Sequence, residues 1–136
     1  MFKTIKINTP PKEILVDITQ EVQEYVQTAG IQEGVCILNV PHTTAAITVN
    51  SGLDPSTMID IVDEVHRIVP TRVDFNHTYD TPADASGHIK SSLIGTTASL
   101  IIHQGKVLLG GSQSIMFFEF DGPRERKVYI RILADK

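Results

Sequence analysis

The sequence lacks several features that would assign it to a specialised class of protein. It has no tryptophan and a single cysteine, Cys36, so no disulfide can form within the chain. Cys36 lies in the apolar run 35–38, which is typical of a buried structural thiol, and a Cys–His nucleophile is therefore not expected. No stretch approaches about 18 consecutive apolar residues, which argues against a membrane-spanning helix. The first residues alternate in character and do not form an apolar signal-peptide core, so we expect a cytoplasmic protein.

The chain is also poor in positive charge. Its 12 Lys and Arg residues stand against 16 Asp and Glu residues, which gives a net charge of −4. Proteins that hold nucleic acid by its phosphates normally present a basic surface, so we expect no nucleic-acid partner. With 136 residues the chain is long enough for one domain, residues 1–136, with a hydrophobic core of its own.

The sequence is rich in β-branched residues, with 17 Ile, 12 Val and 13 Thr against only 8 Leu, and this composition favours sheet. Alternation and short apolar runs predict strands at 2–8, 13–18, 34–40, 45–50, 99–103, 106–109, 114–120 and 127–133. The unbroken apolar run 34–40 predicts a strand buried on both faces. Strand 114–120 is also apolar on both faces. We expect it to be either covered on both sides within the chain or covered on one side by a partner subunit.

Capping residues predict three helices: two main ones, between Thr19 and Gly30 and between Asp54 and Pro70, and a short third from Thr81-Pro82 to about Ile94. In the third helix, Ala85, Ile89 and Leu93 form the expected buried stripe. Strands occur in runs and do not alternate regularly with helices. The pattern therefore predicts one α+β domain with a mostly antiparallel or mixed sheet.

Three of the five histidines, His42, His77 and His88, lie where loops meet secondary structure. Three imidazoles and a water form a known catalytic zinc set, which would suit a hydrolase or lyase, although no short ligand pair such as His-x-x-x-His supports it. Asp84 precedes His88 by four residues and shares its helix face. This carboxylate would accept the imidazole N–H and fix the tautomer, or it would simply form a hydrogen bond on a solvated helix face.

Several segments could bind an anionic ligand such as a phosphorylated metabolite. Residues 95–97 and 110–113 combine glycine with hydroxyl or amide side chains, and Arg124 offers a bidentate guanidinium. None of them is a P-loop or a dinucleotide-binding fingerprint. The alternatives are ordinary turns for the glycines and a surface ion pair with Asp121 or Glu125 for the arginine.

The segment Pro41-His42-Thr43-Thr44 is unusual because it joins two strongly apolar strands with polar residues. Ordinary turns between strands favour Gly, Asn or Asp. Side chains such as these need partners, either the backbone or a ligand.

Three motifs in order resemble the YjbQ-like family: Pro-His-Thr-Thr-Ala-Ala-Ile at 41–47, His-Ile-Lys-Ser-Ser-Leu-Ile-Gly at 88–95 and Glu-Phe-Asp-Gly-Pro-Arg at 119–124. The similarity covers essentially the whole chain. It implies an α+β fold, a compact homotrimer and a site lined by the motif histidines near subunit boundaries. It also implies a secondary, weak thiamine-phosphate synthase activity, which joins a pyrimidine diphosphate to a thiazole phosphate. Ser112 stands where many members have Trp, so a large aromatic wall is missing.

The match to the family carries over a set of site residues: His42, Thr43, Thr44, His77, His88, Gln113, Glu119 and Arg124. A synthase would need Mg²⁺ for the leaving diphosphate, with Asp84, Glu119 and Asp121 as candidate ligands. A hydrolase or lyase would instead hold Zn²⁺ on the three histidines. The third possibility is a trimeric module that binds a phosphorylated metabolite without reaction.

Overall fold

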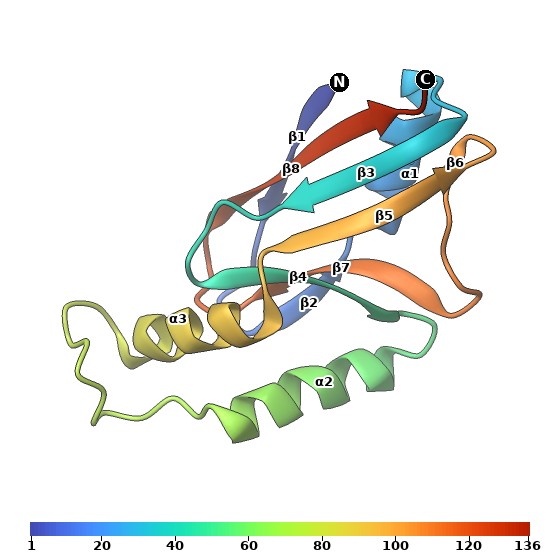
Figure 1. Ribbon diagram of the computed structural model, residues 1–136. Coiled ribbons are helices and arrows are strands. Elements are labelled where there is room, and N and C mark those ends of the chain that lie inside the picture. The colour runs from blue at the N-terminus through green and yellow to red at the C-terminus, as the bar shows by residue number, and fades with distance from the viewer.

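Eight strands and three helices account for most of the chain in the computed structural model, which describes residues 1–136 (Figure 1). Their order is β1 (Phe2–Asn8), β2 (Ile14–Asp17), α1 (Thr19–Ala29), β3 (Glu33–Asn39), β4 (Ala45–Ser51), α2 (Pro55–Ile68), α3 (Pro82–Ile94), β5 (Thr97–His103), β6 (Lys106–Val107), β7 (Gln113–Glu119) and β8 (Glu125–Ala134). None of the helices is long and apolar enough to cross a membrane.

The strands pair antiparallel throughout, but they form two sheets and not one. The five-stranded sheet has the order β1-β8-β3-β5-β6, and the three-stranded sheet has the order β2-β7-β4. The predicted α+β fold is therefore confirmed, and every predicted strand is present. The second sheet was not predicted, because alternation within a strand says nothing about which sheet that strand joins.

The chain passes between the two sheets three times at one end of the molecule, from β1 to β2, from β3 to β4 and from β7 to β8 (Figure 1). Each crossing contains proline, which cannot donate to a strand ladder and so favours a break between strands. The crossings are closely packed, because a Cβ atom on Gly122 would overlap the carbonyl oxygen of Pro10. This packing brings residues from distant parts of the sequence together.

Two hydrophobic clusters fill the molecule, one on each face of the three-stranded sheet. The first lies between the two sheets and α1, and includes Phe117, which is fully buried. The second lies between the three-stranded sheet and helices α2 and α3, and includes Phe118, which is 1% exposed. Strand β7 is therefore covered on both faces within one chain, and it offers no apolar face to a partner subunit.

The prediction that the run 34–40 is buried on both faces is wrong. Cys36 is fully buried against α1, but Val35 points to the other face of the five-stranded sheet and is 37% exposed. Its neighbours across the ladder, Ile101 and Leu133, are more than half exposed. No helix covers this face, so an apolar run alone did not establish burial on both sides (Figure 1).

The helix ends follow the predicted chemistry, with one exception. Asp54 caps α2 by accepting a hydrogen bond from Ser56 N, and Gly30 ends α1 in the left-handed region at φ 69°. Thr19 is not the cap of α1 but its first residue. Its hydroxyl donates to Asp17 Oδ1 at 2.6 Å and accepts from Ile115 N at 2.8 Å, so it joins the helix to strands β2 and β7.

The predicted apolar stripe of α3 is correct only at Ala85, which is 4% exposed. Ile89 and Leu93 are 41% and 63% exposed, and the helix instead buries small and polar residues toward the body of the protein. Gly87 permits this arrangement, because a Cβ atom there would lie 3.1 Å from Thr44 Cβ. Lys90 is fully buried and pairs with Glu13. The helix is therefore placed by close contact and ion pairing, which a hydrophobic period cannot reveal.

A buried ion pair joins the three crossings. Arg126 donates from Nε to Glu119 Oε1 at 2.8 Å and from Nη2 to Glu119 Oε2 at 2.5 Å. The same Nη2 donates to Thr44 Oγ1 at 2.8 Å, and Thr9 Oγ1 donates to Glu119 Oε1 at 2.5 Å. Burial alone would raise the pKa of Glu119, but hydrogen bonds from Arg126, Thr9 and the amide of Asp121 hold it below its ordinary value of 4.5.

We expect Phe117→Ala to lower the free energy of unfolding by about 3–5 kcal/mol, because it leaves a cavity in the core that both sheets share. Urea unfolding followed by circular dichroism measures the loss as a lower midpoint. Phe2→Ala is the matched control, since Phe2 is 52% exposed and its loss should cost less than about 1 kcal/mol. Equal losses in the two variants would contradict the assignment of Phe117 to the core.

We expect Glu119→Gln to lower the free energy of unfolding at about pH 7 by roughly 3 kcal/mol, because Arg126 would stay buried without its counter-charge. The folded-state pKa of Glu119 is depressed, so its contribution is present above the ordinary value of 4.5 and is lost as the pH falls through the folded value. The difference between wild type and variant should therefore shrink below about pH 4.5. Urea midpoints across this range measure it, with exposed Glu125→Gln as the control. A difference that is independent of pH would refute the role of the charge.

Candidate functional site

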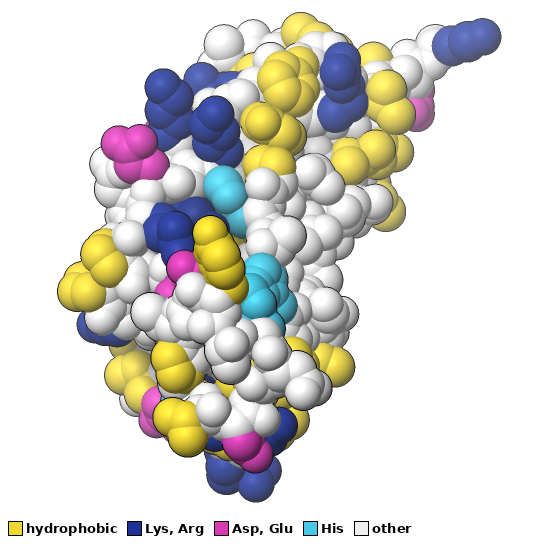
Figure 2. Space-filling view, turned by 90° about the vertical axis from the view of Figure 1, so that its left-hand side faces the viewer, with side chains coloured by type: hydrophobic (Ala, Val, Ile, Leu, Met, Phe, Trp, Pro, Cys, Tyr) yellow, Lys and Arg dark blue, Asp and Glu magenta, His cyan; other side chains and the backbone are white.

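The candidate site lies where the crossing from β3 to β4 meets helix α3. The crossing supplies Pro41, His42, Thr43 and Thr44, and α3 runs beside β4 at the distance that Gly87 permits. Figure 2 shows histidine side chains in two places on this face of the molecule, with Lys and Arg side chains beside the upper one. His42 and Thr43 of this crossing reach the surface, whereas Thr44 is buried.

His77, Asp84 and His88 form the lower part of the site. Asp84 Oδ2 lies 2.8 Å from His77 Nε2 and 3.1 Å from His88 Nε2, and the three ligand atoms lie within 4.8 Å of one another. Asp84 and His88 come from successive turns of α3, while His77 comes from the segment between α2 and α3. Burial alone would raise the pKa of Asp84, but hydrogen bonds from the two imidazoles and their charge hold it below its ordinary value of 3.8.

The hydrogen bonds of His88 cannot all be satisfied by a neutral ring. Its Nδ1 lies 3.2 Å from the carbonyl oxygen of Thr43, and its Nε2 faces Asp84 Oδ2. Both partners are acceptors, whereas a neutral imidazole has a single N–H. His88 in this position therefore needs a second proton, or a metal ion between Nε2 and the carboxylate.

His42 has a different environment from the other two motif histidines. Its Nε2 accepts a hydrogen bond from the backbone N–H of Lys127 at 2.9 Å, which places the proton of the neutral ring on Nδ1. Burial and the nearby charge of Arg126 lower the pKa of His42 below its ordinary value of 6.5. The structure thus brings together His77 and His88 with Asp84 as the third group, and it places His42 against β8.

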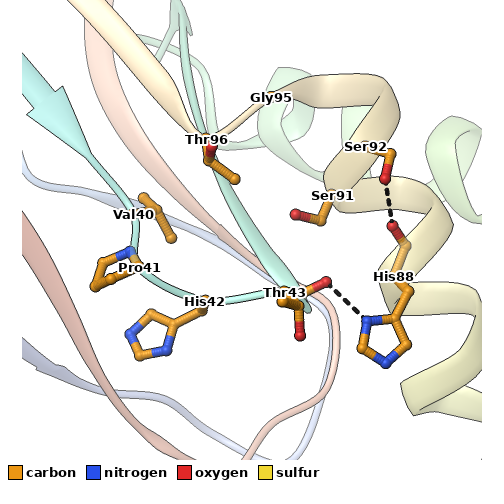
Figure 3. A pocket seen from close by; sticks show the side chains of 9 residues that line it. All are labelled: Val40, Pro41, His42, Thr43, His88, Ser91, Ser92, Gly95 and Thr96. Atoms are coloured by element: carbon orange, nitrogen blue, oxygen red, sulfur yellow. Dashed lines mark hydrogen bonds between the residues drawn. The ribbon is translucent and has the colours of Figure 1, made fainter.

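A polar pocket of about 590 Å³ lies beside His88 (Figure 3). Its walls are the segment before β4, the second half of α3 and the residues that follow this helix. Figure 3 shows the Ser91 hydroxyl pointing toward the space between α3 and Thr96, and His42 and His88 on opposite sides of Thr43. Thr43 therefore contributes to both parts of the site, since its carbonyl oxygen also holds His88.

The remaining predicted site residues take other places. Thr44 is 4% exposed and Glu119 is fully buried, so both support the site from within and do not line it. Arg124 is on the surface, where its Nη2 donates to Asp121 Oδ2 at 2.8 Å, which is one of the two readings that the sequence left open. Gln113 lies at the opposite end of β7 from Glu119, and its Oε1 accepts from Gly110 N at 2.8 Å.

Arg126, the cation that holds the crossings together, was not among the predicted site residues. The signal was present, because Arg126, Val128, Ile130 and Ile132 alternate on the buried face of β8. The predicted strand began one residue later, at 127, so the arginine fell outside the alternating pattern. A strand extended by one residue would have placed this charge among the core positions.

Comparisons with known proteins agree on one family. The family profile described as "UPF0047 protein YjbQ-like" matches residues 3–135. A UPF0047 protein of Methanocaldococcus jannaschii is 41% identical over 136 residues, which span 100% of this chain and 96% of that protein. The UPF0047 protein YugU of Bacillus subtilis is 35% identical over 134 residues, with 98% and 100% of the two chains covered.

Solved structures show the same fold. A YbjQ-like protein of unknown function from Sulfolobus solfataricus superimposes with a TM-score of 0.93 at 31% identity, and the match covers 99% of this chain and 97% of that one. A YjbQ/UPF0047 family protein from Clostridium acetobutylicum gives a TM-score of 0.90 at 37% identity, covering 96% and 99%. The resemblance found in the three motifs is thereby confirmed, and the chain belongs to the YjbQ-like UPF0047 family.

Proposed function

We propose that the protein is a metal-dependent hydrolase that acts on a phosphorylated small molecule, with His77, Asp84 and His88 as the metal ligands. The observation that carries this proposal is the environment of His88, in which both ring nitrogens face acceptors. A divalent ion at Nε2 would relieve the mismatch and would leave the Nδ1–H bond to Thr43 intact. A metal-bound histidine commonly donates its other N–H to such a carbonyl.

The donor set suits Zn²⁺. Two imidazoles and one carboxylate, with a fourth position open, form a known catalytic zinc set, with ligand bonds of about 2.0–2.2 Å. The side chains of His77 and His88 are 43% and 40% exposed, so the open position would face solvent and the neighbouring pocket. When bound, such an ion polarises a phosphoryl oxygen and makes a coordinated water more acidic.

The chain's own residues would orient the reacting groups. The carbonyl of Thr43 keeps the proton of His88 on Nδ1 and thus leaves Nε2 free as a ligand. The Thr81 hydroxyl accepts from Asp84 N at 3.2 Å and fixes the first turn of α3, where the carboxylate lies. His42 presents its Nδ1–H as a neutral donor, and Lys127 beside it supplies a positive charge outside the pocket.

We expect the purified wild-type protein to bind one zinc ion per chain, because His77, Asp84 and His88 present three ligand atoms within 4.8 Å of one another. Isothermal titration calorimetry measures the stoichiometry and the affinity. His88→Ala should weaken binding by at least about a hundredfold, since removing a ligand exceeds the roughly 10- to 100-fold loss typical of its hydrogen-bond partners.

His103→Ala is the matched control for this experiment, because His103 is half exposed and pairs with Glu33 on another part of the surface. It should bind zinc as the wild type does. The zinc-loaded wild type and this control should also release inorganic phosphate from a panel of phosphate esters, and His88→Ala should not. Wild-type protein that binds no more zinc than the double variant His77→Ala/His88→Ala would end the proposal.

The synthase activity implied by the resemblance is a second candidate, and the position of Arg124 favours it. The guanidinium is half exposed, and the carboxylates of Asp121, Asp84 and Glu119 all raise its pKa, with the Asp121 hydrogen bond the largest effect. Arg124 is a permanent cation close enough to Asp84 for the two charges to interact. It could bind the diphosphate that leaves when the pyrimidine and the thiazole are joined.

We expect a synthase of this kind to form thiamine phosphate slowly from the pyrimidine diphosphate and the thiazole phosphate in the presence of Mg²⁺. Arg124→Ala should weaken binding of the diphosphate about tenfold or more, because a charge-assisted hydrogen bond is lost. Product formation followed by chromatography is the measurement, with Arg67→Ala as the control, since Arg67 is exposed on α2 and pairs with Glu64. No product, together with unchanged diphosphate binding in Arg124→Ala, would rule this candidate out.

A further inference from the structure

Two of the four hydroxyl groups that line the pocket beside His88, those of Ser91 and Ser92, are arranged as acceptors, and Thr43 and Thr96 supply the other two. Ser91 Oγ donates its hydrogen to the carbonyl oxygen of Ala45 at 2.8 Å, and Ser92 Oγ donates to that of His88 at 2.9 Å. A hydroxyl has one hydrogen and two lone pairs, so each serine has only lone pairs left for a ligand. Both residues line the pocket, which therefore offers acceptors to whatever binds there.

The backbone around the pocket also favours ligand groups that donate hydrogen bonds. Ser92 and Gly95, which line it, lie at the C-terminal end of α3, where the helix carbonyls carry partial negative charge. Groups with N–H or O–H donors are stabilised at this end of a helix, and anions are not. A phosphate group in the pocket would therefore meet the wrong end of the helix dipole.

The pocket also contains no permanent cation. Its lining includes no Lys or Arg, and His42 is kept neutral because burial and the charge of Arg126 lower its pKa. The other histidine of the lining, His88, already has the carboxylate of Asp84 against its Nε2. Two basic side chains, Arg126 and Lys127, act on His42 from strand β8, and Arg126 is itself paired with Glu119. An anionic group thus has no counter-charge inside the pocket and is better placed at the metal site next to it.

We propose that this pocket binds the organic part of the substrate, and that this part carries several hydroxyl or ammonium donors. The phosphate group then lies at the His77–Asp84–His88 site, so this assignment of the substrate class rests on the proposed function. A polyol and an aminoalkyl group share the required chemistry, since both present hydrogens to serine oxygens and helix carbonyls. An alkyl group of the same length does not.

Three phosphate esters of equal chain length test the proposal by calorimetry on the zinc-loaded protein: n-propyl phosphate, glycerol 1-phosphate and 3-aminopropyl phosphate. We expect glycerol 1-phosphate, 3-aminopropyl phosphate or both to bind about fivefold to tenfold more tightly than propyl phosphate, the gain of one good hydrogen bond. The better of the two identifies the donor as hydroxyl or ammonium. Ser92→Ala should reduce this preference, because it removes one acceptor. Ser112→Ala, on the exposed turn before β7, should leave it unchanged.

A second measurement does not depend on the metal. In the metal-free protein, glycerol or 3-amino-1-propanol should shift the amide resonances of Ser92, Gly95 and Thr96 in NMR spectra, and 1-propanol should not. Equal binding of the three phosphates, or equal shifts with 1-propanol, would overturn the inference while the zinc site stands. Selective shifts in a protein that takes up no zinc would instead keep the pocket assignment and remove the proposed function.

Discussion

The buried pair of Glu119 and Arg126 is the interaction on which the arrangement of the site depends. Three of the crossings between the two sheets lie at one end of the molecule, and this pair with Thr9 and Thr44 connects all three of them. Burying two charges is costly, and the mutual attraction offsets this only when the remaining lone pairs and protons are also satisfied. Here every buried polar side-chain atom has a partner, so the network fixes one geometry.

The Glu119–Arg126 pair also affects the positions of His42 and His88, although it does not contact these side chains. Arg126 Nη2 also contacts the carbonyl oxygen of Thr44 at 3.3 Å, and the preceding carbonyl, that of Thr43, faces His88 Nδ1. The residue after the arginine, Lys127, supplies the backbone N–H that sets the tautomer of His42. His42 and His88 are therefore both oriented by backbone groups adjacent to the anchored residues. A substitution at the pair would change their orientation before it changed any direct contact with a ligand.

Much of the fold could be predicted because it follows from local chemistry. Asp54 and Thr81 cap helices, Gly30 ends one, and alternation or short apolar runs predicted every strand. The failures share a cause, since they depend on what packs against an element from far away in sequence. Ile89 of α3 is exposed because small residues on the other side of that helix lie against β4. His77 and Asp84 meet through a loop whose path no sequence period describes. The positions of the histidines beside loops suggested a set of three, whereas the structure presents two histidines and a carboxylate.

The ion pairs within the chain determine which carboxylates remain free to bind a metal ion. Of the three carboxylates that were candidate Mg²⁺ ligands, Glu119 forms an ion pair with Arg126 and Asp121 forms one with Arg124. Asp84 alone remains, and it is shared by two imidazoles. Mg²⁺ prefers an octahedron of oxygens and is usually held by one or two carboxylates together with substrate phosphates, whereas imidazole nitrogen suits Zn²⁺. A synthase reaction at this site would therefore take most of the oxygen ligands for Mg²⁺ from the diphosphate of its substrate. The chain's own residues favour zinc, because the arginines that stabilise the crossings have already taken the other two carboxylates.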